Sequence, residues 1–169
     1  MTIAELFPIE EGRVMVYGYE GDDAAGEGPR TATMTFGDVR EENGALRATV
    51  TETVPRRKRP EMVSVVRRSA SELTENGDPE LLLKAPIAAG TQWLSGVYEM
   101  RIQDVDAEVT VPAGTFKCVT VSCFVEDMGA DSFWYAPGVG LVKAARKVEP
   151  PRRVYELMSV KPGNGKKGE

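Results

Sequence analysis

The feature that most constrains this chain is a proline and a glycine set between two short β-branched or aromatic runs, a pattern that occurs twice. The first case is the phrase VTVPAGTF, residues 109–116. In it, Pro112 presets φ at one turn position, and Gly114 can adopt a positive φ that closes the turn. The pattern predicts a tight antiparallel hairpin around residues 112–114.

The second case is the phrase YAPGVGLVK, residues 135–143. Pro137 and Gly138 suit the two central positions of a type II turn, whose second position requires φ > 0. Gly140 follows one residue into the next run and indicates a bulge or a close backbone approach. These prolines and glycines are therefore interpreted as structural turn residues.

The rest of the chain repeats the same logic of short alternating segments and turns. Residues 31–39 and 46–51 alternate apolar and polar side chains around Asn43-Gly44, a strong type I′ hairpin signal, and Asn76-Gly77 is a second such dipeptide. We count roughly ten or eleven strands by this criterion, and no helical period after residue 12. Twist accumulates across so many strands, so a flat sheet is not expected.

The predicted fold is therefore all-β, with a single strongly curved antiparallel sheet that forms an open or partly closed barrel and little helix. Residues 1–160 form one domain, and residues 161–169 (KPGNGKKGE) form a flexible tail. Residues 21–30 (GDDAAGEGPR) read as a mobile loop. Residues 55–60 (PRRKRP) read as a solvated hairpin tip, with a nuclear-localisation or polyanion-binding segment as the alternative.

Composition excludes several classes of function. The formal net charge of −5 argues against general nucleic-acid binding, which requires a positive surface. The chain has no histidine, which removes the commonest general base and the usual imidazole metal ligand. Cys118 and Cys123 lie beyond disulfide reach if they share an extended strand, so we interpret both as reduced thiols. No metal site and no cofactor is predicted.

The first twelve residues contain no basic segment followed by an apolar one, so they do not read as a signal peptide. No run approaches the roughly 20 apolar residues of a transmembrane helix. Taken as written, the sequence predicts a cytoplasmic protein. The alternative is an exported or periplasmic protein whose leader has been removed.

The two phrases, together with the opening residues 7–17 and with residues 90–93 (GTQW), resemble a family of uncharacterised bacterial β-proteins. Its members carry a VPAGTF segment followed by a YYAPGVGLVK segment, and many are regarded as secreted or lipid-anchored proteins. The resemblance covers roughly residues 7–160 and implies a fold similar to the unclosed half-barrels of lipoprotein-localisation factors. Here Trp134 precedes Tyr135 in the second segment. The resemblance implies no catalytic residues.

Aromatic side chains are the best candidates for a ligand-lining surface, because a curved sheet has a concave face and apolar pockets are commonly lined by large rings. The candidate ligand-binding residues are Trp93, Tyr98, Phe116, Trp134 and Tyr135. The alternative is that these rings simply fill the core. Asp104, Asp106, Glu108 and Lys143 could serve a cation site or acid–base chemistry, but a solvated strand face is the simpler interpretation.

Three functional hypotheses follow. The leading one is a non-enzymatic binding module that holds a hydrophobic small molecule or a partner segment on the concave face. The second is a structural or interaction domain that pairs through exposed sheet edges. The third is a carboxylate-based enzyme, which would require acids to converge with a lysine or tyrosine in a cleft.

Overall fold

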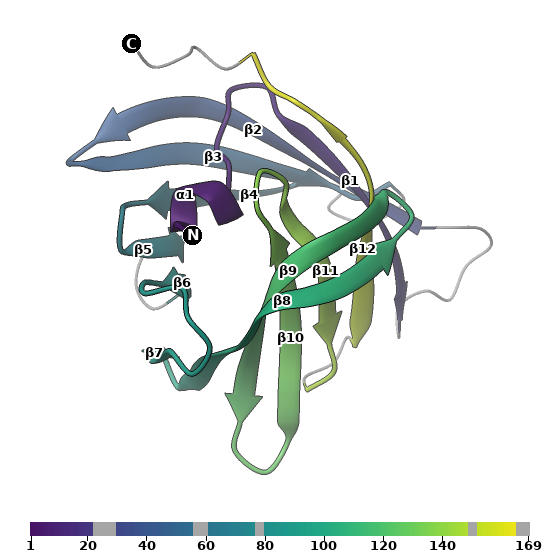
Figure 1. Cartoon of the computed structure of the whole chain (residues 1–169). Coiled ribbons are helices and arrows are strands. Elements are labelled where there is room, and N and C mark those ends of the chain that lie inside the picture. The colour runs from purple at the N-terminus through teal and green to yellow at the C-terminus, as the bar shows by residue number, and fades with distance from the viewer. Residues whose placement is uncertain (22–29, 56–60, 77–79, 149–151, 165–169) are drawn as a thin grey trace.

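The computed structural model describes residues 1–21, 30–55, 61–76, 80–148 and 152–164. A single sheet with one short helix accounts for almost all of them (Figure 1). The elements are α1 (Ile3–Leu6), β1 (Val14–Gly21), β2 (Arg30–Glu42), β3 (Ala45–Thr53), β4 (Glu61–Arg68), β5 (Glu72–Glu75), β6 (Leu81–Lys84), β7 (Gln92–Ser95), β8 (Tyr98–Val111), β9 (Gly114–Val125), β10 (Gly129–Ala136), β11 (Gly140–Arg146) and β12 (Arg153–Lys161).

The strand order is β6-β5-β4-β3-β2-β1-β12-β11-β10-β9-β8-β7, and every hydrogen-bonded pair is antiparallel. Neighbours in the sheet are also neighbours in sequence, except where the first strand β1 pairs with the last strand β12. The sheet curls until its two edge strands, β6 and β7, face each other (Figure 1). The prediction of an all-β fold with one strongly curved antiparallel sheet in an open or partly closed barrel is confirmed.

The described residues form twelve strands rather than the ten or eleven expected. Residues 92–95, expected to follow a loop, form the edge strand β7. Residues 98–103 and 108–111, expected as separate strands, are the two ends of the single strand β8. Register shifts between Ile102 and Asp104, and again between Asp104 and Ala107, absorb the acidic stretch between them without ending the pairing with β9.

Side chains bridge the seam, which we define as the junction of β6 and β7. The indole Nε1 of Trp93 donates to the carbonyl of Leu81 at 2.9 Å, and the backbone N–H of Leu81 donates to Oγ of Ser95 at 2.9 Å. Trp93 and Ser95 are both buried. Side chains of β7 thus satisfy both backbone groups of Leu81 on β6, so the sheet is nearly a closed barrel without a backbone ladder at the seam.

The turn residues singled out above have the following geometry. Asn43 and Gly44 both have positive φ, 51° and 74°, and join β2 to β3 as a two-residue hairpin. Gly138 has φ 75°, and the N–H of Val139 bonds to the carbonyl of Ala136 at 3.1 Å. Gly114 has φ 141° at the start of β9. The hairpin before it reaches across the sheet, since the N–H of Ala113 donates to the carbonyl of Leu157 on β12 at 2.9 Å.

Four sequence interpretations cannot be compared with the structure in full. They are the loop at 21–30, the basic run at 55–60, the second hairpin dipeptide at 76–77 and the tail at 161–169, each of which lies partly outside the described residues.

Candidate functional site

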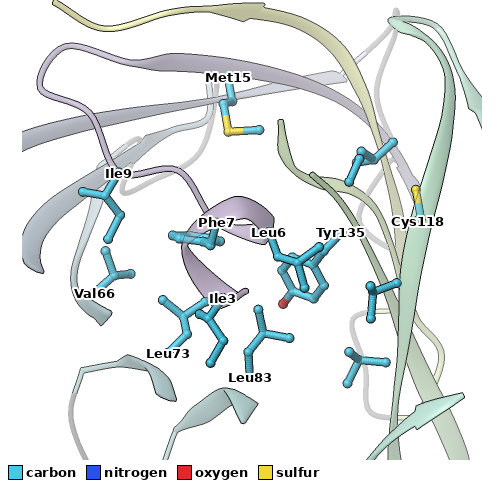
Figure 2. Packing of buried hydrophobic residues seen from close by; sticks show 14 of the residues in the cluster. Ile3, Leu6, Phe7, Ile9, Met15, Val66, Leu73, Leu83, Cys118 and Tyr135 are labelled. Atoms are coloured by element: carbon cyan, nitrogen blue, oxygen red, sulfur yellow. The ribbon is translucent and has the colours of Figure 1, made fainter. Parts of the chain in front are cut away.

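The interior of the barrel contains the chain's own N-terminus. Four side chains from residues 3–9 are buried in the main hydrophobic cluster, namely Ile3, Leu6, Phe7 and Ile9. Figure 2 shows α1 between the Val66, Leu73 and Leu83 side chains and the ring of Tyr135. We call residues 2–9 the N-terminal plug, because no strand contributes these side chains.

The plug is helical for local reasons. The Thr2 side chain accepts from the N–H of Glu5 at 3.2 Å, and the Glu5 carboxylate accepts from the N–H of Thr2 at 2.6 Å, which together form a capping box. α1 has only four residues, which is too short for an isolated helix to be stable in water. Packing therefore stabilises it more than helix propensity does.

Apolar contact and two tertiary hydrogen bonds hold the plug in place. The ring centroids of Phe7 and Phe36 lie 5.9 Å apart in an edge-to-face arrangement. The carbonyl of Glu5 accepts from the N–H of Gly138 at 2.7 Å, and the carbonyl of Phe7 accepts from Nη1 of Arg68 at 2.7 Å. The plug therefore touches the Pro137-Gly138 turn on one side and β4 on the other.

The segment after the plug is fixed more strongly than the plug itself. The guanidinium of Arg13 is buried, bonds to the Glu10 carboxylate at 3.1 Å and donates to the carbonyl of Val139 at 2.7 Å. The same Glu10 carboxylate accepts from the N–H of Gly163 at 3.1 Å. Buried, charge-assisted bonds of this kind are the strong ones. Residues 10–13 consequently act as the fixed base of the plug.

The predicted aromatic residues do not form one surface. Trp93 and Tyr135 are buried in the main cluster, whereas Tyr98, Phe116 and Trp134 are half-buried at its margin. Trp134 points to the sheet face opposite Tyr135, because side chains alternate along β10, and Nζ of Lys143 lies 5.8 Å from the centroid of its indole ring. Trp93 and Tyr135 are thus the two members of this set that are fully part of the buried core, and the other three pack against its margin.

Burial changes the acidity of three interior groups. Desolvation raises the pKa of Tyr135 well above its ordinary value, with a further increase from Glu75 and an opposing effect from Arg146. Desolvation likewise raises the pKa of Tyr17, whose hydroxyl donates to the carbonyl of Leu141 at 2.7 Å. Burial raises the pKa of the Cys118 thiol to about 11, so this thiol is a poor nucleophile near neutral pH. Cys118 and Cys123 are both free.

The candidate acid–base residues lie apart from the interior. Asp104, Asp106 and Glu108 are exposed on β8, and Nζ of Lys117 lies 3.7 Å from Asp106 and 4.0 Å from Glu108. Lys143 packs over Trp134 instead of approaching them. Within the described ranges, no group of three or more Cys, Asp or Glu side chains is arranged to hold a metal ion. These acids form a solvated, paired strand face.

Two surface depressions adjoin residues already described. One of about 350 Å³ borders the edge strand β7 and is lined by Gln92, Trp93, Leu94, Glu99, Met100, Arg101 and Phe124. The other, of about 290 Å³, adjoins α1 and is lined by Ala4, Glu41, Gly44, Ala45, Leu46, Arg68, Ser69 and Ala70. The open aromatic pocket expected on the concave face is thus replaced, at this end of the barrel, by a filled interior with a depression beside the plug.

Sequence reasoning missed the plug and Arg68. A signal for the plug was present, because Thr2 and Glu5 have the T-x-x-E spacing of a capping box directly before apolar residues. Arg68 gave no such signal. It ends a strand as an ordinary charged residue, and only the curl of the sheet brings it against the carbonyl of Phe7.

Comparison with known proteins identifies the fold. No protein-family model and no curated protein matches the chain. A crystal structure from Bacteroides fragilis, described as a putative exported protein with YmcC-like fold, has a TM-score of 0.60 and 15% identity over 92% of this chain and 98% of its own. A second, described as a putative lipoprotein from Parabacteroides distasonis, has a TM-score of 0.54 and 18% identity over the same shares. In the described part of the present chain, no helix is long and apolar enough to cross a membrane. The two structural matches show that the chain is similar in fold to these two bacterial proteins.

Proposed function

We propose that this protein is a non-enzymatic binding module whose barrel interior holds the apolar chain of a hydrophobic small molecule or of a partner segment. The observation that supports the proposal is the plug: the interior is occupied by an apolar segment that belongs to no strand. A ligand of similar chemistry takes the place of the plug, while residues 10–13 keep the displaced segment tethered. Catalysis plays no part in this function.

The plug sets the size of ligand that can replace it. Burial of Ile3, Leu6, Phe7 and Ile9 contributes about 1.5–3 kcal/mol per side chain, or roughly 6–12 kcal/mol in total. A methylene group contributes about 0.8 kcal/mol on burial, so roughly 8–15 methylenes are needed to compensate. Long single chains therefore compete with the plug, and short ones do not.

The alternative of pairing through sheet edges receives less support. The edge strands β6 and β7 have four residues each and are bridged to one another by Trp93 and Ser95. Short edges that are already partly satisfied are poor templates for another strand. For location, we favour the exported alternative over the cytoplasmic one, because both solved structures of similar fold are described as an exported protein or a lipoprotein.

A plug variant tests the proposal. Leu6→Ala weakens the plug from within, and N-phenyl-1-naphthylamine, a neutral dye that fluoresces in apolar surroundings, reports access to the interior. We expect the variant to bind more dye than wild type at a temperature where both are folded, and a sixteen-carbon alcohol to displace the dye. In wild type, the same alcohol should speed hydrogen exchange at the amides of residues 6 and 7, which bond within α1.

Val54→Ala is the matched control, because Val54 is equally buried but lies in the separate cluster with Tyr19 and Ala32. Both substitutions create a cavity that costs on the order of 1–5 kcal/mol. If both variants lose stability but Leu6→Ala binds no more dye than Val54→Ala, the plug is an ordinary part of the core and the proposed function is wrong.

A further inference from the structure

Arg68 is a cation placed on the inner face of the sheet. It lies two residues beyond the buried Val66 on β4 and pairs across the sheet with Leu46 on β3 and Leu73 on β5. Its guanidinium is half-buried, and burial lowers the pKa of Arg68. A charge in such a position is costly unless an opposite charge accompanies it.

No such charge accompanies it within the described residues. The hydrogen bond that Arg68 makes there goes to a neutral carbonyl, that of Phe7 at 2.7 Å. Two other arginines differ from it in this respect: Arg13 bonds to Glu10 at 3.1 Å, and Arg47 bonds to Asp38 at 2.9 Å. Among the described groups, Arg68 thus has guanidinium N–H donors to spare and no carboxylate within ion-pairing distance.

The space for an anion lies directly beside it. The depression of about 290 Å³ that adjoins α1 is lined by Arg68 and, apart from Leu46 and Glu41, by small residues: Ala4, Gly44, Ala45, Ser69 and Ala70. Ala4 is an exposed residue of the plug, so the depression borders the plug. Glu41 is exposed at the rim and is the one acid among these residues.

From this arrangement we infer that Arg68 and the depression beside α1 form the head-group site for an anionic single-chain amphiphile, whose carboxylate or phosphate binds the guanidinium while its alkyl chain replaces the plug. The inference rests on the proposed function. In this arrangement, binding of the head group is coupled to binding of the alkyl chain, because the Arg68 guanidinium that binds the anion also holds the carbonyl of Phe7. Head-group binding therefore loosens the plug that the tail must displace.

Competition against N-phenyl-1-naphthylamine on the full chain tests the inference, with every ligand below its micelle concentration. Hexadecanoate carries the carboxylate head group and hexadecyl phosphate the phosphate head group. Hexadecanol is the neutral control, and acetate and inorganic phosphate test the anionic groups without a long alkyl chain. We expect either anionic amphiphile to bind wild type at least tenfold more tightly than hexadecanol, the better of the two identifying the head group, and the free anions not to compete.

The variants separate a head-group role from a structural one. Arg68→Met removes the charge and also frees the carbonyl of Phe7, so hexadecanoate should bind about tenfold more weakly while hexadecanol binds as well as or better than before. Loss of structure alone would move both affinities in the same direction. Arg68→Lys should restore part of the preference for the anion. Glu41→Gln, which leaves the core untouched, should tighten hexadecanoate and leave hexadecanol unchanged.

The outcomes distinguish the two proposals. Equal affinities of wild type for hexadecanoate, hexadecyl phosphate and hexadecanol would overturn the head-group site and leave the proposed function standing. So would a preference for the anion that persists in Arg68→Met. If no long-chain ligand competes with the dye in wild type or in Leu6→Ala, the proposed function fails, and the head-group site fails with it.

Discussion

At the scale of single residues, backbone geometry and burial have separable effects, and Gly138 isolates the first. Its φ of 75° is unfavourable for any residue with a β-carbon, yet nothing lies within 4 Å of the position that such a carbon would take. Gly138→Val should therefore lower the free energy of unfolding by conformational strain alone, by at least the ~1–2 kcal/mol typical of the left-handed region. Urea denaturation measures the change.

Gly37→Ala is the control for this substitution, because Gly37 lies within β2 without a positive φ and a methyl group there meets only the Glu11 carboxylate at 3.6 Å. A Gly138→Val variant as stable as Gly37→Ala would contradict the turn geometry and the register of β10 and β11.

Buried tyrosine makes stability depend on alkaline pH. Tyr135 remains protonated in the folded protein because its pKa is raised, whereas in the unfolded chain it ionises near pH 10. The unfolded state alone then loses the proton, so the stabilisation present below pH 10 is lost as pH rises. Between pH 8 and pH 11 this effect costs wild type about 1.4 kcal/mol that Tyr135→Phe does not lose.

Denaturation of both proteins across this pH range measures the difference, and Tyr17→Phe should show the same change for the same reason. In each comparison, the free energy of unfolding of the Tyr→Phe variant should fall less with rising pH than that of wild type. Parallel pH profiles for wild type and both variants would show that neither phenol is held neutral by burial.

At the scale of elements, the sequence pattern correctly predicted those hairpins and strands that depend only on adjacent residues. The hairpin at Asn43-Gly44 and the alternation along residues 46–51, which buries Ala48 and Val50, are properties of a few adjacent residues, and both are found in the structure. The extent of β8 was not predictable in this way. Its acidic centre around Asp104 and Asp106 has the sequence character of a loop between two strands. The strand continues there because it stays paired with β9 across two register shifts.

The candidate site was less predictable than the fold for a related reason. Aromatic residues in a sequence indicate apolar surface, but they do not indicate which part of that surface is buried by another segment of the chain. Trp93 ends at the seam because the curl of the sheet brings the carbonyl of Leu81 to its indole. Tyr135 lies beside Leu6 of α1 in the core, where the N-terminal segment covers it (Figure 2). Both outcomes depend on contacts between residues far apart in sequence.

At the scale of the whole molecule, one long-range pairing joins the two halves of the sheet. Every strand pair joins sequence neighbours except β1 with β12, which brings residues 14–21 against residues 153–161. Closing a loop of that length costs entropy before any contact compensates, and topologies rich in such contacts fold slowly. The seam between β6 and β7 is the converse case, because its strands are adjacent in sequence and lack a backbone ladder.

A circular permutant should therefore fold faster than the natural chain. With new termini between Ala88 and Ala89, both exposed in the connection from β6 to β7, and a flexible linker from the C-terminus to Met1, the strand order becomes β7 through β12 followed by β1 through β6. Every hydrogen-bonded pair is then local. Stopped-flow refolding should show a rate increase on the order of tenfold or more, following the dependence of rate on contact order.

The permutation should cost little stability, because the connection it cuts carries few bonds, among them Oγ1 of Thr91 to the carbonyl of Pro86 at 2.8 Å. A permutant with its new termini in the Asn43-Gly44 turn is the matched control. It gains the same local β12–β1 pairing, but it makes β2–β3 the new distant pair, so its refolding rate should stay near that of the natural chain. Equal acceleration in both permutants would mean that pairing of β1 with β12 is not what limits folding.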